Sequence, residues 1–87
     1  MRPNEHLRVH LNRRESVRVA SFAEAARTIL EYIRRNDLGS SGFYSGPSAG
    51  LIDRAGRIVA NVSYNGRVWQ GSDRFATNQT EITTKGA

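Results

Sequence analysis

The chain has 87 residues, of which 38% are hydrophobic and 24% charged, with a net charge of +5 and no cysteine. This length predicts one small domain that buries about 60% of its unfolded surface. The lack of cysteine excludes disulfides and thiolate metal sites, and no apolar run approaches the roughly 18 residues that a membrane-spanning helix needs. Because no apolar signal region is present near the start, we expect a cytoplasmic protein.

Two short strands are predicted near the N-terminus, after a segment at residues 1–5 that we expect to be frayed. Residues 6–12 alternate between apolar and polar side chains, which is typical of a half-buried strand. Residues 17–20 form a second apolar stretch after a polar turn. We interpret this stretch either as the hairpin partner of the first strand or as an extended lead into the following helix.

One amphipathic helix is predicted from Ser21 to Asp37. Ser21 and Glu24 form a capping box, in which the serine hydroxyl accepts from the glutamate amide and the glutamate side chain reaches back. Gly39 is expected to follow the C-terminal cap. An apolar stripe at helical spacing indicates that the helix packs on a sheet; it consists of Phe22, Ala25, Ala26, Ile29, Leu30 and Ile33.

A loop of small residues at 40–50 contains two aromatic residues, Phe43 and Tyr44. As an exposed loop it is a candidate for contact with a protein partner. The alternative is that both aromatic side chains cover the end of the core. A phosphate-binding loop is excluded, because the G-K-[ST] motif is absent and a strand follows where such a loop would open a helix.

Residues 51–70 predict three antiparallel strands joined by two tight turns. The expected strand limits are 51–53, 57–64 and 67–70. The polar residues 72–87 predict a disordered tail. The predicted fold is therefore α+β, with one amphipathic helix packed on an antiparallel sheet in a single domain at 6–71. Its order is strand, strand, helix, strand, strand, strand.

The two turns predict the register of these strands. The first turn, at 53–56, is expected to be a type I turn that pairs Asp53 with Arg57 and Ile52 with Ile58. The second turn, at Asn65-Gly66, is expected to be a type I′ turn that pairs Tyr64 with Arg67 and Val62 with Trp69. Alternation then predicts one apolar face, made of Ile52, Ile58, Ala60, Val62 and Trp69.

Basic residues gather at two places in the predicted sheet. The candidates are Arg8, His10 and Arg18 in the N-terminal hairpin, and Tyr64 and Arg67 at the Asn-Gly turn with Arg57 further along the sheet. The first group suits a phosphate backbone, and the second combines an aromatic ring with arginine, as proteins that stack single-stranded bases do. For the first group the alternative is an ordinary solvated surface. For the second group the alternative is that Trp69 is a core residue under the helix, rather than a ligand-facing one, and that Tyr64 and Arg67 form an ordinary cross-strand pair.

No motif predicts catalysis, a metal or a cofactor. The two histidines, His6 and His10, would lie about 13 Å apart on one strand, which is too far to share a metal ion. The sequence predicts a small non-enzymatic binding module, and its positive charge suits nucleic acid or an acidic protein. The alternative is a protein-interaction or homo-oligomerising module that uses an open sheet edge or the 40–50 loop. The excess of arginine over lysine also fits the base composition of a GC-rich genome.

Overall fold

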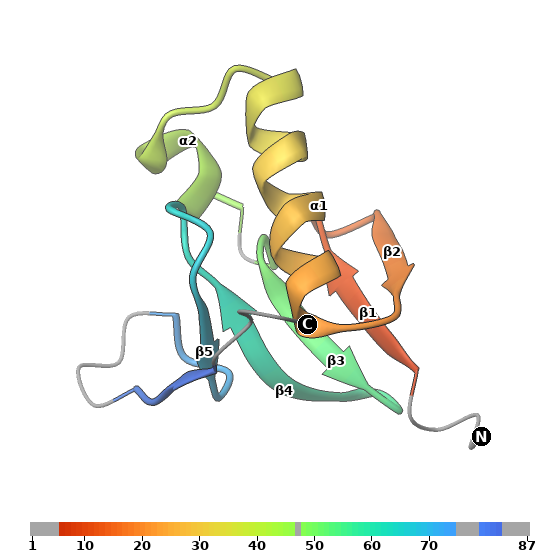
Figure 1. Ribbon diagram of the computed structural model, residues 1–87. Coiled ribbons are helices and arrows are strands. Elements are labelled where there is room, and N and C mark those ends of the chain that lie inside the picture. Colours follow the sequence, from red (N-terminus) through yellow and green to blue (C-terminus); the bar gives the residue numbers. More distant parts are fainter. Residues whose placement is uncertain (1–5, 47, 75–78, 83–87) are drawn as a thin grey trace.

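The computed structural model describes residues 6–46, 48–74 and 79–82, which form one antiparallel sheet and two helices (Figure 1). The elements are β1 (Leu7–His10), β2 (Ser16–Val19), α1 (Phe22–Arg35), α2 (Ser40–Tyr44), β3 (Leu51–Arg54), β4 (Arg57–Val62), β5 (Val68–Gln70) and β6 (Glu81–Ile82). The strand order in the sheet is β2-β1-β3-β4-β5-β6. The predicted α+β class is confirmed, with β2 as the hairpin partner of β1, and the structure adds α2 and β6 to the expected elements.

α1 lies across one face of the sheet, and the hydrophobic core fills the space between them (Figure 1). The largest side chains that are fully buried there are Phe43, Ile29, Ile52, Val9, Val62 and Val68. In the predicted apolar stripe of α1, Leu30 is the exception, because 39% of it is exposed. None of the described helices is long and apolar enough to cross a bilayer.

Capping interactions define both ends of α1. The Glu24 amide donates to the Ser21 hydroxyl (3.1 Å), and the Glu24 carboxylate accepts from the Ala20 amide (2.7 Å), so the predicted capping box is present. At the other end Asp37 has a positive φ of 52°, and the Leu38 amide donates to the Ile33 carbonyl (3.0 Å). The left-handed residue that ends the helix is thus Asp37 and not Gly39.

The β3–β4 turn differs from the predicted type I turn. Ala55 and Gly56 both have positive φ, 55° and 82°, as the two central residues of a type I′ turn do. Arg57 therefore pairs with Arg54, and the predicted pairing of Arg57 with Asp53 is wrong. Alanine is uncommon in the left-handed conformation. The sequence pattern therefore favoured the type I turn, which needs only Gly56 to be left-handed and leaves three residues between Asp53 and Arg57.

A β-bulge then changes the register between β3 and β4. Ile52 pairs with Ala60, whereas the next residue, Asp53, pairs with Ile58, so that Val59 is the additional residue on β4. Ile52 and Ala60 lie under α1 and are fully buried. Ile58 shares the opposite face with Asp53, so its predicted place beside Ile52 is wrong.

The β4–β5 turn has three residues rather than two. The Gly66 amide donates to the Ser63 carbonyl (2.9 Å), and the Ser63 amide donates to the Arg67 carbonyl (2.8 Å). Gly66 has a φ of 88°, whereas Asn65 is not left-handed. This geometry is a type I turn followed by a glycine bulge, which the dipeptide Asn-Gly supports as well as a type I′ turn.

The additional turn residue reverses the predicted orientation of Trp69. Val62 pairs with Val68, and Trp69 pairs with Asn61. Because a shift of one residue moves a side chain to the other face of a sheet, Trp69 lies on the face away from α1, where it is half-buried. The prediction that Trp69 shares a face with Val62 is therefore wrong.

Two polar side chains hold the segment after β5. The buried Asn61 amide donates to the Gly71 carbonyl (2.9 Å) and to Gln79 Oε1 (3.0 Å). Arg74 Nη1 donates to the carbonyls of Gly46 (3.0 Å) and Ala49 (2.9 Å). The expectation of disorder over 72–87 therefore differs from the structure at 72–74 and 79–82, while residues 1–5, 75–78 and 83–87 lie outside the described part.

A comparison of two glycines tests the packing of β3 against the core. A Cβ on Gly50 would lie 2.5 Å from the Val62 carbonyl oxygen and 3.1 Å from Phe43 Cζ, whereas a Cβ on Gly56 would meet nothing within 4 Å. Both glycines are left-handed. We expect Gly50→Ala to cost about 3 kcal/mol or more and Gly56→Ala about 1 kcal/mol, measured by chemical denaturation. Equal costs would contradict the close approach at Gly50.

A truncation tests the contacts of the tail. Deletion after Asp73 removes Arg74, β6 and one acceptor of the buried Asn61 amide. We expect the melting temperature to fall by about 10 °C, because lost hydrogen bonds to a charged group and a buried amide cost about 2 kcal/mol in a domain of this size. Arg74→Ala in the full chain should reproduce part of the fall. An unchanged melting temperature in both variants would show that these contacts do not stabilise the fold, as expected for a disordered tail.

Candidate functional site

The sheet face away from α1 carries the charged residues of the N-terminal hairpin. Arg8 on β1 lies directly opposite Arg18 on β2 on one side and Asp53 on β3 on the other. The neighbouring residues Val9 and Ile52 are fully buried beneath α1. Because side chains alternate along a strand, Arg8, Arg18 and Asp53 project from the other face.

The hydrogen-bond partners of both arginines are neutral. Arg8 Nη1 donates to the Ser16 hydroxyl (3.2 Å), and Arg18 Nη2 donates to His6 Nδ1 (2.5 Å). Within the described part of the chain, neither guanidinium has a carboxylate oxygen within 4 Å. Two like charges that face each other across a strand pair repel, so this arrangement favours the approach of an anion.

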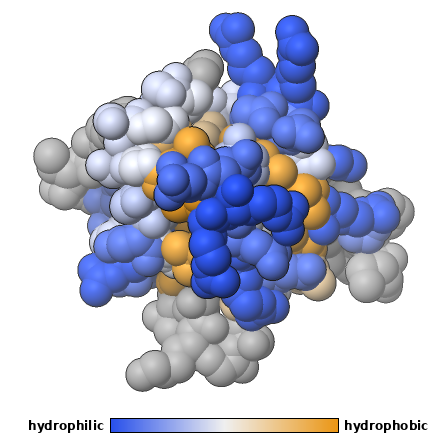
Figure 2. Space-filling model, turned by 90° about the horizontal axis from the view of Figure 1, so that it is seen from above, coloured by the Kyte–Doolittle hydropathy of each residue, from blue (hydrophilic) through white to orange (hydrophobic). Residues whose placement is uncertain are grey.

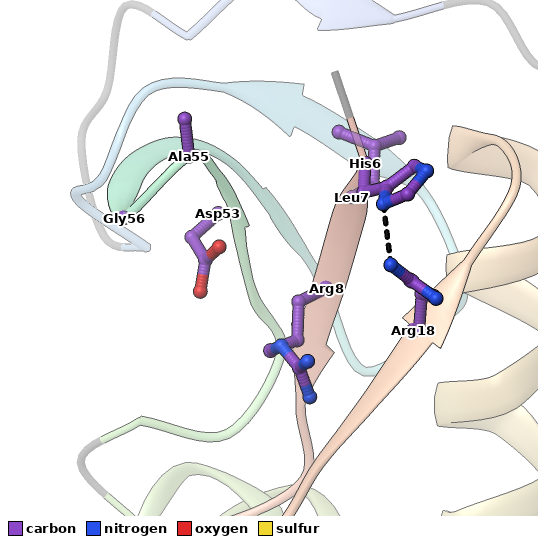
Figure 3. A pocket seen from close by; sticks show the side chains of 7 residues that line it. All are labelled: His6, Leu7, Arg8, Arg18, Asp53, Ala55 and Gly56. Atoms are coloured by element: carbon purple, nitrogen blue, oxygen red, sulfur yellow. Dashed lines mark hydrogen bonds between the residues drawn. The ribbon is translucent and has the colours of Figure 1, made fainter. Parts of the chain in front are cut away.

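A pocket of about 240 Å³ opens between these strands and the β3–β4 turn (Figure 3). Its lining residues are His6, Leu7, Arg8, Arg18, Asp53, Ala55 and Gly56. The guanidinium groups of Arg8 and Arg18 lie on one side of it, and the turn with Asp53 lies on the other (Figure 3).

His10 shares this face with Arg8 but has an internal partner. His10 Nε2 lies 2.7 Å from Asp53 Oδ2, and 26% of the histidine side chain and 17% of the aspartate side chain are exposed. The structure thus brings Arg8, His10 and Arg18 together, as the alternation predicted. Asp53, however, contacts His10, and among the described residues no carboxylate oxygen lies within 4 Å of either guanidinium.

Tyr64 does not belong to this face. Its hydroxyl donates to the Leu38 carbonyl (3.0 Å), its amide donates to the Tyr44 hydroxyl (2.8 Å), and its ring packs 6.3 Å from that of Phe43. These contacts place Tyr64 against the core on the α1 side. The proposed role of Tyr64 in base stacking is therefore corrected.

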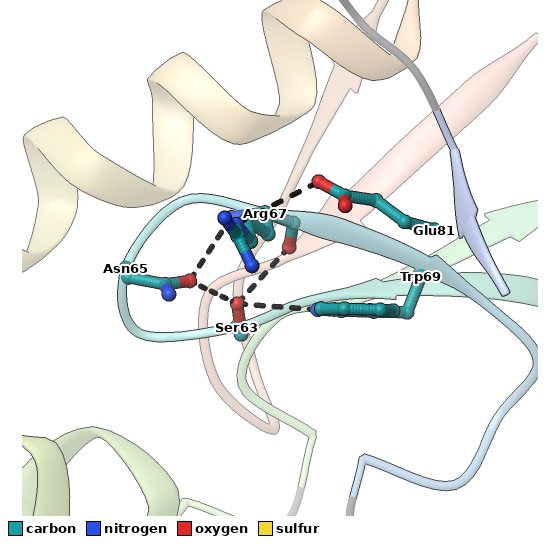
Figure 4. Close-up of polar contacts among 5 residues, drawn as sticks. All are labelled: Ser63, Asn65, Arg67, Trp69 and Glu81. Atoms are coloured by element: carbon teal, nitrogen blue, oxygen red, sulfur yellow. Dashed lines mark hydrogen bonds and ion pairs between the residues drawn. The ribbon is translucent and has the colours of Figure 1, made fainter. Parts of the chain in front are cut away.

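The aromatic residue on the sheet face away from α1, which we call the open face, is Trp69. Its indole Nε1 donates to the Ser63 hydroxyl (3.4 Å), and Arg67 lies on the same face at the end of the hairpin (Figure 4). Arg67 Nε is 3.7 Å from Glu81 Oε2 in an exposed ion pair. A glycine-bulge interpretation of Asn65-Gly66 would have placed Trp69 here from the sequence, because the register would then shift by one residue.

Arg57 lies apart from the other candidates. It pairs with Arg54 at the β3–β4 turn, and the Arg54 guanidinium sits 5.9 Å from the centre of the Phe22 ring of α1. The Arg54–Arg57 pair is therefore on the α1 side of the sheet. Arg57 does not join Arg67 and Trp69 in one surface.

The two aromatic residues of the 40–50 loop are part of the core. Phe43 is 1% exposed and lies in α2, and Tyr44 is half-buried with its ring 4.9 Å from that of Phe43. The alternative reading, in which they cover the end of the core, is the one that the structure supports. The surface where α1 ends and α2 begins is mostly hydrophilic, with separate hydrophobic patches (Figure 2).

The described residues contain no group of three or more histidine, cysteine or acidic side chains that would hold a metal ion. No protein-family model, curated protein or solved structure matches the chain. The geometry of the open face is therefore the basis for any functional assignment.

A conservative substitution tests the placement of Tyr64. Tyr64→Phe removes the hydroxyl that satisfies the Leu38 carbonyl, and we expect it to cost about 1 kcal/mol. Tyr32→Phe is the matched control, because among the described residues the Tyr32 hydroxyl has one long contact, with Asn12 (3.4 Å). This substitution should cost less than about 0.5 kcal/mol. Chemical denaturation measures both. A neutral Tyr64→Phe would show that the hydroxyl has no structural partner.

Proposed function

We propose that the sheet face away from α1 binds single-stranded nucleic acid, with phosphate contacts from Arg8 and Arg18 and base stacking on Trp69. The observation that carries this proposal is the opposed pair of arginines whose partners in the described chain are neutral. Arginine forks match phosphate oxygens with two parallel hydrogen bonds. A bound phosphate would also relieve the repulsion between the two guanidinium groups.

The spacing on the sheet supports a single strand that crosses several β-strands. β1 and β5 are three steps apart in the sheet, which corresponds to about 14 Å. Trp69 lies further along the sheet than Arg8, because it pairs with Asn61 whereas Arg8 pairs with Asp53. The segment after β5 covers Asn61, so a strand that contacts both Arg8 and Trp69 must pass around that segment. Aromatic side chains on a sheet stack bases without strong sequence preference, so we expect a nonspecific binder. We also propose a cytoplasmic location, with which the lack of cysteine agrees.

A protein-interaction role has one observation in its favour, the open edge at β2. The Gly50 amide donates to the His10 carbonyl, so the main-chain groups of His10 point to β3 and not to β2. By the antiparallel alternation, the main-chain groups of Ser16 and Arg18 point away from β1 towards the edge. Val17 beside them is 37% exposed. The strand has only four residues and carries a charged one, which limits its use for pairing.

Titration with a mixed-sequence single-stranded oligonucleotide tests the nucleic-acid proposal. Trp69 is the one tryptophan of the chain, so its fluorescence reports directly on the face. At about 50 mM salt we expect quenching, and Arg8→Glu or Arg18→Glu should lower the affinity and reduce the slope of log K against log salt by about 0.7 for each lost phosphate contact. Trp69→Ala, followed by anisotropy of a labelled oligonucleotide, should weaken binding by about 1–3 kcal/mol.

Arg34→Glu is the matched control, because it changes the net charge equally but lies on α1. It should have a much smaller effect than the sheet variants. Equal losses from all three charge reversals would indicate attraction by net charge alone. Absence of binding at low salt, together with a mass that rises with protein concentration, would favour pairing through the β2 edge instead.

A further inference from the structure

The pocket of Figure 3 differs from a flat phosphate-binding stripe in its charge arrangement. On one side Arg8 and Arg18 supply two positive charges whose partners in the described chain are neutral, the Ser16 hydroxyl and His6 Nδ1. These acceptors hold the guanidinium groups in place before any ligand arrives. Such preorganisation reduces the entropy that a ligand would otherwise lose on binding.

The opposite side of the pocket is acidic and closed by the β3–β4 turn. Asp53 and the turn residues Ala55 and Gly56 line it. Asp53 uses Oδ2 for the contact with His10, so its carboxylate is held at the pocket rather than turned away. A second phosphate on this side would be repelled by the carboxylate, whereas a sugar hydroxyl could donate to it.

From these two sides we propose that the pocket binds a phosphomonoester, the terminal phosphate of a nucleotide or of a nucleic-acid strand, with Asp53 accepting from a hydroxyl of the attached sugar. This inference rests on the proposed function for its choice of ligand. The two arginines suit a phosphomonoester, whose charge is close to −2 above its second pKa of about 6. A phosphodiester inside a strand carries only one negative charge. The strand must also continue out of the pocket in two directions, and one of these leads towards the Asp53 carboxylate.

Small probes separate the two phosphate classes. The full chain is titrated with methyl phosphate and with dimethyl phosphate at pH 7.5, and amide shifts are followed by NMR. We expect methyl phosphate to shift residues 6–8, 16–18 and 53–56 at about one tenth of the concentration that dimethyl phosphate requires, because one additional charge-assisted contact corresponds to about tenfold in affinity. Equal midpoints for the two probes, or shifts spread over all arginines, would overturn the proposal.

Variants of the two arginines show whether the pocket is responsible. Arg8→Gln and Arg18→Gln keep a polar side chain with an N–H donor but shorten it and remove its charge, and each should abolish the preference for methyl phosphate. Arg34→Gln on α1 is the matched control and should retain the preference. Thermal unfolding of each variant verifies that it is folded. Retention of the preference in both Arg8→Gln and Arg18→Gln would overturn the assignment to this pocket.

A second pair of probes distinguishes a strand end from a free nucleotide. A short oligonucleotide with a terminal phosphate at either end is compared with the same oligonucleotide ending in hydroxyl groups. Tighter binding of a phosphorylated form, by about tenfold, supports a strand end as the ligand. If methyl phosphate binds but terminal phosphates add nothing, the strand end is overturned and a free phosphomonoester is supported.

The failures of the two proposals are separable. Salt-dependent binding of the hydroxyl-ended oligonucleotide, with no preference among the small probes, would leave the nucleic-acid proposal standing and overturn the phosphomonoester site. A clear preference for methyl phosphate, without binding of any oligonucleotide, would support the pocket and overturn the nucleic-acid proposal.

Discussion

The placement of every side chain on β4 and β5 depends on the backbone conformation of two turns and one bulge. Three features together determine which residues face α1. They are the left-handed Ala55 and Gly56, the additional residue at Val59 and the left-handed Gly66. A change of one residue at any of these points would move the following side chains to the other face. Trp69 shows the consequence, because it reaches the open face through one additional turn residue.

The position of α1 leaves the two faces of the sheet with different roles. Apolar side chains of β1, β3, β4 and β5 are buried against α1, and Phe43 of α2 and Tyr64 of the β4–β5 turn complete that layer. On the other face, Arg8 and Arg18 oppose each other with neutral hydrogen-bond partners. Like charges directly opposite each other lower the stability of a sheet, and Asp53 on the other side of Arg8 offsets part of this cost.

The segment after β5 shows how buried polar groups organise a chain with few apolar residues. Asn61 is 1% exposed, and its amide needs acceptors, which Gly71 and Gln79 provide. Arg74 in turn donates to two carbonyls in the segment between α2 and β3. Ile82 adds one apolar contact with the core, and the other contacts of the segment are hydrogen bonds to distant parts of the chain, which hydrophobicity does not reveal.

Local patterns in the sequence determined the α+β class, the capping box at Ser21 and the alternation that puts Arg8, His10 and Arg18 on one face. These features depend on neighbours within a few residues, and their periods of 3.6 and 2 are visible in the chain. Only the tertiary structure decided the face of Trp69, the packing of Tyr64, the pairing of His10 with Asp53 and the contacts of residues 72–74 and 79–82. The physical reason is that Ala55 and Asn65-Gly66 each allow more than one turn. Packing of Gly66 against Leu30, and of Ile52 and Val62 beneath α1, accompanies the register that the protein adopts.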